Sequence, residues 1–239
     1  MPTAWGDCPP LPQGTTFVNG TVEQKLDRLA IREICEGWPT HRDAQEWPRY
    51  RSLFDDDAYI FTTWSGGCTI DEFIEVSKKG FHNGDRIMHQ AIGTTVETKG
   101  DRAVAKMKAV ITQRFKLPAQ DGNDEVEVDV ECQNRFTYFL QKNSAGDWKI
   151  NYYKVFYEKD HMIPVNPLQL PKLDNKLLES IPYGYRFLGY CQSLIGHKVL
   201  HDLPEAKGAE SDRLYEATVA WMDGKGKGDV DKLLKINRK

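Results

Sequence analysis

The chain has 239 residues, enough to bury a substantial core in one domain with attachments. Its formal net charge of -3 gives no basic footprint for nucleic acid or for an anionic membrane. The 5 cysteines form no CxxC pair, which favours free thiols over a disulfide framework or a thiolate metal site. No segment has the pattern of a signal peptide or approaches the length of a membrane span. We therefore expect a soluble cytoplasmic protein with no nucleic-acid or membrane partner.

The first predicted element is a helix that follows a surface arm. Residues 1–20 are rich in Pro, Gly and Thr and show no periodicity, which predicts the arm. Thr21 and Gln24 have the pattern of a capping box, and apolar residues then recur at helical spacing as far as Trp38. Pro39 cannot donate to the carbonyl four residues before it and crowds that carbonyl, so we expect the helix to kink or stop there.

Polar residues gather where this helix is expected to break. We expect a second helix to begin after Asp43, so that Trp38, His41 and Asp43 face a cavity. Asp43 has two interpretations on sequence alone. Together with Glu46 it forms an N-terminal capping pattern for the second helix. It is equally a candidate catalytic carboxylate.

The middle of the chain alternates between strand and turn signals. Residues 55–57 are expected to form a solvated turn, and residues 69–80 a short helix that Gly80 closes. Three long strands in succession after a helical start predict a curved antiparallel sheet with helices packed on its concave face, an α+β fold. The stretches rich in β-branched and aromatic residues, or alternating in polarity, are 58–64, 86–97, 102–117, 126–142 and 148–159.

The last third of the chain changes character. Prolines interrupt it and strand alternation ends, while helical spacing returns within 183–200 and 211–221. We expect a domain over residues 21–160 and a helical extension over 161–223 that packs back on it. Residues 224–239 are predicted to be a basic, mobile tail.

The order of these elements resembles the NTF2-like cone fold of the SnoaL-like and scytalone dehydratase-like families, over roughly residues 21–160. In those families an aspartate after the first helix faces a histidine on the strand that enters the sheet. The resemblance pairs Asp43 with His89 of the segment RIMHQ and favours the catalytic interpretation of Asp43. Scytalone dehydratase itself fits less well, because Arg42, Thr62 and Gln133 stand roughly where that enzyme uses two tyrosines and a second histidine.

A narrower resemblance is to fungal cofactor-independent hydroxybenzoic acid decarboxylases, which act on gallic and protocatechuic acids. The segments CEGWPTHRDAQEW, YIFTTWSGG and IMHQ carry it, and it extends through the C-terminal extension. It implies non-oxidative decarboxylation of a small phenolic acid, with Asp43 and His89 as the acid–base dyad and Trp38 and Trp64 as a substrate clamp. It also implies a homotrimer, no organic cofactor, and a potassium ion whose ligands the sequence does not identify.

The chemistry of such a reaction suits these residue types. Direct loss of CO2 would leave an unstable aryl anion, so the ring carbon must be protonated as or before the carbon–carbon bond breaks. His89 is the natural proton donor, because imidazole titrates near neutral pH, and Asp43 would orient it and favour its charged form. Strand alternation adds Thr62, Gln133 and Tyr153 as weaker candidates for the cavity wall.

Two alternatives stay open. The same Asp–His pair would serve enolisation in a dehydratase or cyclase acting on a polyphenolic or polyketide intermediate. The fold also serves as a small-ligand-binding module without catalysis.

Overall fold

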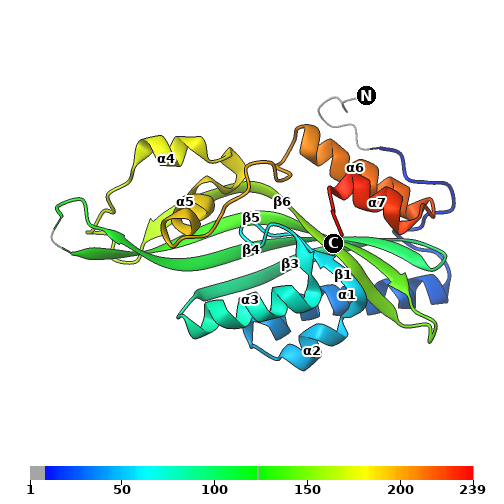
Figure 1. Cartoon of the computed structure of the whole chain (residues 1–239). Coiled ribbons are helices and arrows are strands. Elements are labelled where there is room, and N and C mark those ends of the chain that lie inside the picture. The colour runs from blue at the N-terminus through cyan, green and yellow to red at the C-terminus, as the bar shows by residue number, and fades with distance from the viewer. Residues whose placement is uncertain (1–8, 123, 239) are drawn as a thin grey trace.

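The alternating stretches in the middle of the chain form one curved sheet in the computed structural model, which describes residues 9–122 and 124–238. The strand order is β2-β1-β6-β5-β4-β3, antiparallel except where β1 runs parallel to β6 (Figure 1). The predicted α+β fold is confirmed. The strands are β1 (Phe54–Ile60), β2 (Cys68–Thr69), β3 (Arg86–Lys99), β4 (Arg102–Pro118), β5 (Glu125–Lys142) and β6 (Trp148–Pro164).

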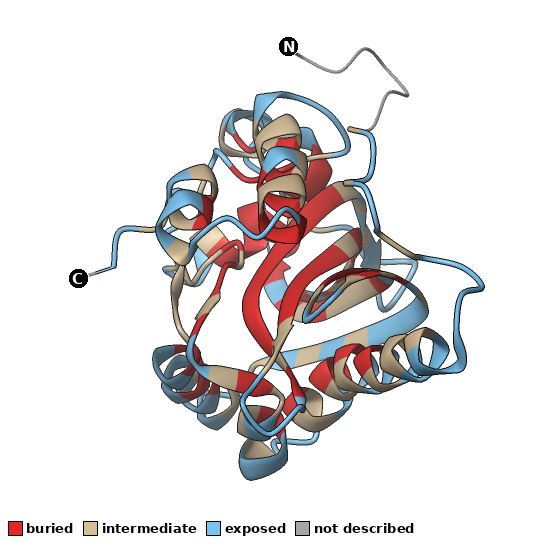
Figure 2. Ribbon diagram, turned by 90° about the vertical axis from the view of Figure 1, so that its right-hand side faces the viewer, coloured by how far each residue is buried: buried red, intermediate tan, exposed pale blue. Residues whose placement is uncertain are grey.

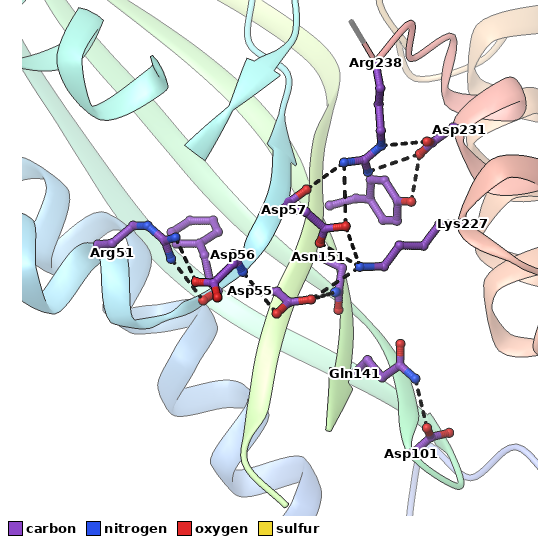
Figure 3. A network of polar contacts seen from close by, with 12 residues as sticks. Arg51, Asp55, Asp56, Asp57, Asp101, Gln141, Asn151, Lys227, Asp231 and Arg238 are labelled. Carbon is purple, nitrogen blue, oxygen red and sulfur yellow. Dashed lines mark hydrogen bonds and ion pairs between the residues drawn. The ribbon is translucent and has the colours of Figure 1, made fainter. Parts of the chain in front are cut away.

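The first strand begins earlier than its sequence predicts. The acidic run Asp55, Asp56 and Asp57 lies within β1 rather than in a turn. Its side chains meet cations, with Arg51 donating to Asp56 and Lys227 to Asp57 (Figure 3). The pairing of β1 with β6 is irregular between Phe54 and Tyr59, so the acidic residues occupy a distorted part of the strand.

The first three helices lie together on one side of the sheet (Figure 1). They are α1 (Val22–Asp43), α2 (Trp47–Ser52) and α3 (Ile70–His82). The predicted capping box of Thr21 and Gln24 is present at the start of α1. The expectation that the helix could stop at Pro39 is wrong, because α1 continues to Asp43 with the proline inside it. The carbonyl of Cys35, four residues before Pro39, accepts a hydrogen bond from the hydroxyl of Tyr138 on β5 instead.

The C-terminal third adds α4 (Asn175–Ser180), a 3-10 turn η1 (Tyr183–Tyr185), α5 (Arg186–Leu194), α6 (Ala209–Met222) and α7 (Lys227–Leu234). Leu188 and Cys191 of α5 belong to the same apolar core as α1 and α3. In contrast, α6 and α7 cover the opposite face of the sheet, where Trp221 packs against Phe139 and Tyr152. The middle strands are therefore buried on both faces (Figure 2).

The end of the chain is a helix rather than the predicted mobile tail. Val230 and Leu234 of α7 are fully buried against the sheet. The basic residues that suggested a solvated tail make ion pairs, with Lys227 bound to Asp57 and Arg238 to Asp231 (Figure 3). Within residues 9–122 and 124–238, no helix combines the length and apolarity needed to span a membrane.

Candidate active site

Asp43 and His89 lie against each other where the end of α1 meets the start of β3. One carboxylate oxygen of Asp43 accepts the backbone N–H of His89 at 2.6 Å, and the other lies 2.8 Å from His89 Nδ1. Because an ionised carboxylate only accepts, Nδ1 carries the proton of this second bond. The capping interpretation of Asp43 is wrong, since the N-cap residue of α2 is Glu46, which makes no side-chain cap.

The electrostatics of the pair set their charge states. Burial acts to raise the pKa of Asp43, but the charge and hydrogen bonds of His89, together with Arg42, bring that pKa below its ordinary value. Burial lowers the pKa of His89, and Asp43 offsets this only in part while Arg42 adds to it. The free protein at neutral pH therefore carries an ionised Asp43 beside a neutral His89. Among the described residues, nothing hydrogen-bonds His89 Nε2, the nitrogen left for a ligand.

A small cavity with aromatic walls, about 30 Å³ in volume, opens beside His89. Trp38 stacks on Tyr153 with ring centroids 4.8 Å apart, and Trp64 stacks on Phe73 at 5.8 Å. A wider space of about 330 Å³ adjoins it, and the residues that line both are Arg42, Trp64 and Ile87. The wider space has the size of a small-ligand pocket, and the small cavity would connect a ligand bound there to His89.

The residues predicted from sequence divide into two groups. Trp38, Trp64, Thr62 and Tyr153 line the cavity together with His89, whereas Asp43 lies behind the imidazole and does not line it. Gln133 does not line the cavity either. It is half-buried on β5, between Val110 of β4 and Lys159 of β6, while its neighbours Cys132 and Asn134 are buried.

His41 also departs from its prediction. Its Nδ1 lies 2.6 Å from a carboxylate oxygen of Glu46, so the ring is engaged outside the cavity. The expectation that His41 would face the cavity depended on the kink at Pro39, and α1 does not break there.

Sequence patterns missed a buried polar chain on the cavity wall. Thr63 donates to the amide oxygen of Gln192 at 2.6 Å, and the Gln192 amide donates to that of Gln113 at 3.2 Å. Ile111 and Gln113 are two residues apart on β4, so their side chains point to the same face of the sheet. Strand periodicity could therefore have placed both on the cavity wall. No sequence signal links Thr63 to Gln192 on α5, because the two are 129 residues apart.

Arg42 is a second cavity residue that the sequence patterns did not identify. Its side chain is only 3% exposed, and its Nη1 lies 3.3 Å from Asp43. Its guanidinium lies 5.2–6.0 Å from the ring centres of Trp38, Phe73 and Phe81. Its Nε has no hydrogen-bond partner within the described part of the chain. The signal that could have found it is its place beside Asp43 on the same helical turn.

We identify no cluster of acidic side chains among the described residues for the potassium ion that the resemblance implies. Within residues 9–122 and 124–238, no three His, Cys, Asp or Glu side chains gather in a way that could hold a metal ion. The potassium ion stays a prediction, and we assign it no ligands.

The curved sheet, the covering helices and the Asp–His pair define a SnoaL-like protein with an aromatic cavity. The chain belongs to the SnoaL-like domain family, whose model matches residues 23–154. It is 41% identical over 228 residues to an uncharacterized protein of Emericella nidulans, covering 90% of this chain and 93% of that protein. It is 40% identical over 216 residues to pea pathogenicity protein 2 of Fusarium vanettenii, covering 86% and 90%.

Solved structures resemble the chain more distantly. The crystal structure of a putative scytalone dehydratase from Novosphingobium aromaticivorans is similar, with 14% identity, a TM-score of 0.47, and coverage of 58% of this chain and 88% of that one. The family model thus confirms the predicted SnoaL-like family, while the narrower resemblance to hydroxybenzoic acid decarboxylases stays a prediction.

Proposed function

We propose that this protein removes CO2 non-oxidatively from phenolic benzoic acids such as gallic or protocatechuic acid, without an organic cofactor. The observation that carries the proposal is the pair of hydrogen bonds that His89 donates to Asp43, which fixes the imidazole and leaves Nε2 free beside aromatic walls. The resemblance to hydroxybenzoic acid decarboxylases supplies the substrate class.

The proposed reaction is a proton transfer followed by loss of CO2. The imidazolium of His89 gives its Nε2 proton to the ring carbon that bears the carboxylate, and a para hydroxyl supplies electron density to that carbon. The electron pair of the carbon–carbon bond then returns to the ring as CO2 leaves. One proton is consumed in each turnover, so neutral His89 regains a proton from solvent before the next.

The lowered pKa of His89 fits this cycle when the ligand is an anion. A neutral imidazole in the free protein cannot donate a proton, but a bound carboxylate favours the charged form. Binding of the substrate would then bring a proton to His89, while the ionised Asp43 stabilises the resulting imidazolium.

Acid catalysis accounts for part of the rate. A positioned acid typically gives on the order of 10²–10⁴-fold. Trp38 touches five other rings and is 1% exposed, so it acts as a fixed wall rather than a movable clamp. Walls that twist the carboxylate out of the ring plane could add about 1–5 kcal/mol, and preorganised charges the remainder.

Incubation with gallate or protocatechuate tests the proposal. We expect CO2 together with pyrogallol or catechol, and in D2O a deuterium at the carbon that carried the carboxylate. The protein should stay active in EDTA. Absence of turnover with every hydroxybenzoate would refute decarboxylation.

The neutral state of His89 favours a second candidate, a dehydratase or cyclase in which Nε2 removes a proton to form an enol. This candidate predicts loss of water or ring closure without CO2. Mass spectrometry of products from polyphenolic ketones would distinguish the two. Ligand binding without any product would favour the non-catalytic module.

A further inference from the structure

We propose that Arg42 binds the carboxylate of the ligand, so that the cavity selects aromatic acids over neutral phenols. The inference rests on the proposed function only in that the ligand is an aromatic acid. It does not require that the acid lose CO2.

The hydrogen bonds of Arg42 leave most of its donors free. A guanidinium has five N–H donors in one plane. Its one hydrogen-bond contact with an acceptor among the described residues is the 3.3 Å approach to Asp43 Oδ1, the same oxygen that lies 2.8 Å from His89 Nδ1. A buried cation with unfilled donors is costly, and a ligand carboxylate would fill them.

The aromatic contacts do not fill these donors. Arg42 lies within about 6 Å of three rings, a range in which a cation is attracted to the ring face. Such contacts use the charge of the guanidinium rather than its N–H groups. They help to keep the cation buried and oriented, as a preformed anion site requires.

The position of Arg42 suits a ligand that must also reach His89. Both residues line the smaller cavity, and Arg42 also lines the wider space next to it. The planar guanidinium can hold a carboxylate through two parallel hydrogen bonds, which would fix the orientation of the attached ring. The other acid nearby, Asp85, lines only the wider space, and no hydrogen bond joins it to Arg42 among the described residues.

The charges of the occupied site balance. Arg42 is positive, Asp43 negative and the ligand carboxylate negative, so a protonated His89 brings the sum to zero. A neutral phenol would instead leave His89 uncharged and unable to donate. By binding the acid, Arg42 would bring in the negative charge that favours protonation of His89.

An unreactive pair of ligands tests this assignment. Benzoate lacks the hydroxyl that activates the ring, and benzamide is its neutral counterpart. We expect the wild-type protein to bind benzoate at least about 30-fold more tightly than benzamide, measured by calorimetry or tryptophan fluorescence. Arg42→Gln should remove this preference, and Arg42→Lys should keep part of it. Arg114→Gln is the matched control, because Arg114 pairs with Asp129 outside the cavity.

Several outcomes would overturn the assignment. Equal affinity of the wild-type protein for benzoate and benzamide is one, and an unchanged preference in folded Arg42→Gln is another. If Arg42→Gln does not fold, the wild-type ligand pair and Arg42→Lys decide. Binding of benzoate through Arg42 without CO2 release from any hydroxybenzoate would uphold the inference and refute decarboxylation.

Kinetics give a further readout. The carboxylate keeps its charge until CO2 departs, so Arg42 would hold it equally in the complex and during proton transfer to the ring. Arg42→Lys should therefore raise KM more than it lowers kcat. A drop confined to kcat would indicate a different role.

Discussion

A single carboxylate determines how the imidazole of His89 faces the cavity. Asp43 binds both the backbone N–H and Nδ1 of His89, so rotation of the ring and exchange of its tautomer are both opposed. Asp43 is buried behind the imidazole and would act through it, which makes it a positioning residue in the proposed reaction.

Replacing Asp43 by Asn tests that role. Asn keeps an oxygen for the backbone N–H of His89 but has no charge to stabilise the imidazolium. We expect turnover to fall by on the order of 10²–10⁴-fold, with little change in the urea unfolding midpoint. The double variant with His89→Ala should lose little more than His89→Ala alone. Near-normal turnover by folded Asp43→Asn would remove the dyad from the mechanism.

The direction of the pH dependence separates acid from base catalysis. The pKa of His89 is lowered by burial, and the acid mechanism needs its protonated form. Hence kcat/KM, which reports the free protein, should fall as the pH rises through this lowered pKa. The bound carboxylate stabilises the imidazolium, so kcat should persist to higher pH. A rate that instead increases with pH over this range would favour the base role of the dehydratase candidate.

The sequence located the residues that share a local pattern. The family resemblance pairs Asp43 with His89 and names Trp64, whereas strand alternation adds Thr62 and Tyr153 correctly and Gln133 wrongly. Gln192 could not be placed in this way, because only the packing of α5 on the sheet brings it to Gln113.

At the scale of elements, α1 passes through a proline, and β5 supplies a hydrogen bond to the carbonyl four residues before it. Pro39 cannot donate to the carbonyl of Cys35, and the hydroxyl of the fully buried Tyr138 does so instead. The helix therefore continues for one more turn. That turn ends at Asp43.

Tyr138→Phe tests this substitution of donors. It would remove this hydrogen bond to the Cys35 carbonyl, and we expect a loss of about 1–3 kcal/mol in the free energy of unfolding. Adding Pro39→Ala supplies a backbone N–H and should recover part of that loss. Urea denaturation of the two single variants and the double variant measures the coupling. Strict additivity would show that Tyr138 and Pro39 act independently.

The buried side of α7 allows a second test at this scale. Leu234 is fully buried, so Leu234→Ala should cost about 2–5 kcal/mol. Lys232→Ala on the exposed side of the same helix should have a small effect. Urea unfolding again provides the measurement. Equal, small effects of both variants would mean that this helix contributes little to the fold.

The long strands were predictable and α7 was not, for one physical reason. Alternation marks a strand whatever covers it, so β4, β5 and β6 could be located to within a few residues. The basic residues of α7 suggested solvation, yet acidic partners on β1 neutralise some of them. Those partners lie about 170 positions earlier in the chain, beyond the range of any local pattern.

At the scale of the whole molecule, apolar side chains remain on the surface. Leu26 and Leu29 of α1 are among the apolar residues at helical spacing that precede Trp38, yet they are 58% and 53% exposed. Ile92 is 68% exposed on β3, the strand at one edge of the sheet. A trimer would cover such groups if its interface joined them into one contiguous apolar surface.

We therefore retain the homotrimer as a proposal. Light scattering should give three times the chain mass of 27.4 kDa. Leu29→Glu should weaken the assembly if α1 contributes to it, while Leu168→Glu, at a site that is 92% exposed, serves as the control. A monomeric mass for the wild-type protein would contradict the proposal.

The final turns of α1 carry Trp38, Arg42 and Asp43 within about 8 Å of helix axis. These three side chains provide a wall, a charge and the support of the imidazole, yet they belong to one rigid rod. A substitution in α1 that shifts the helix along its axis would displace all three side chains together. Small misplacements of reacting groups are costly. We therefore expect substitutions that shift the position of α1 on the sheet to change activity more readily than single replacements of the three residues. Such shifts would be accompanied by compensating substitutions in the sheet beneath the helix.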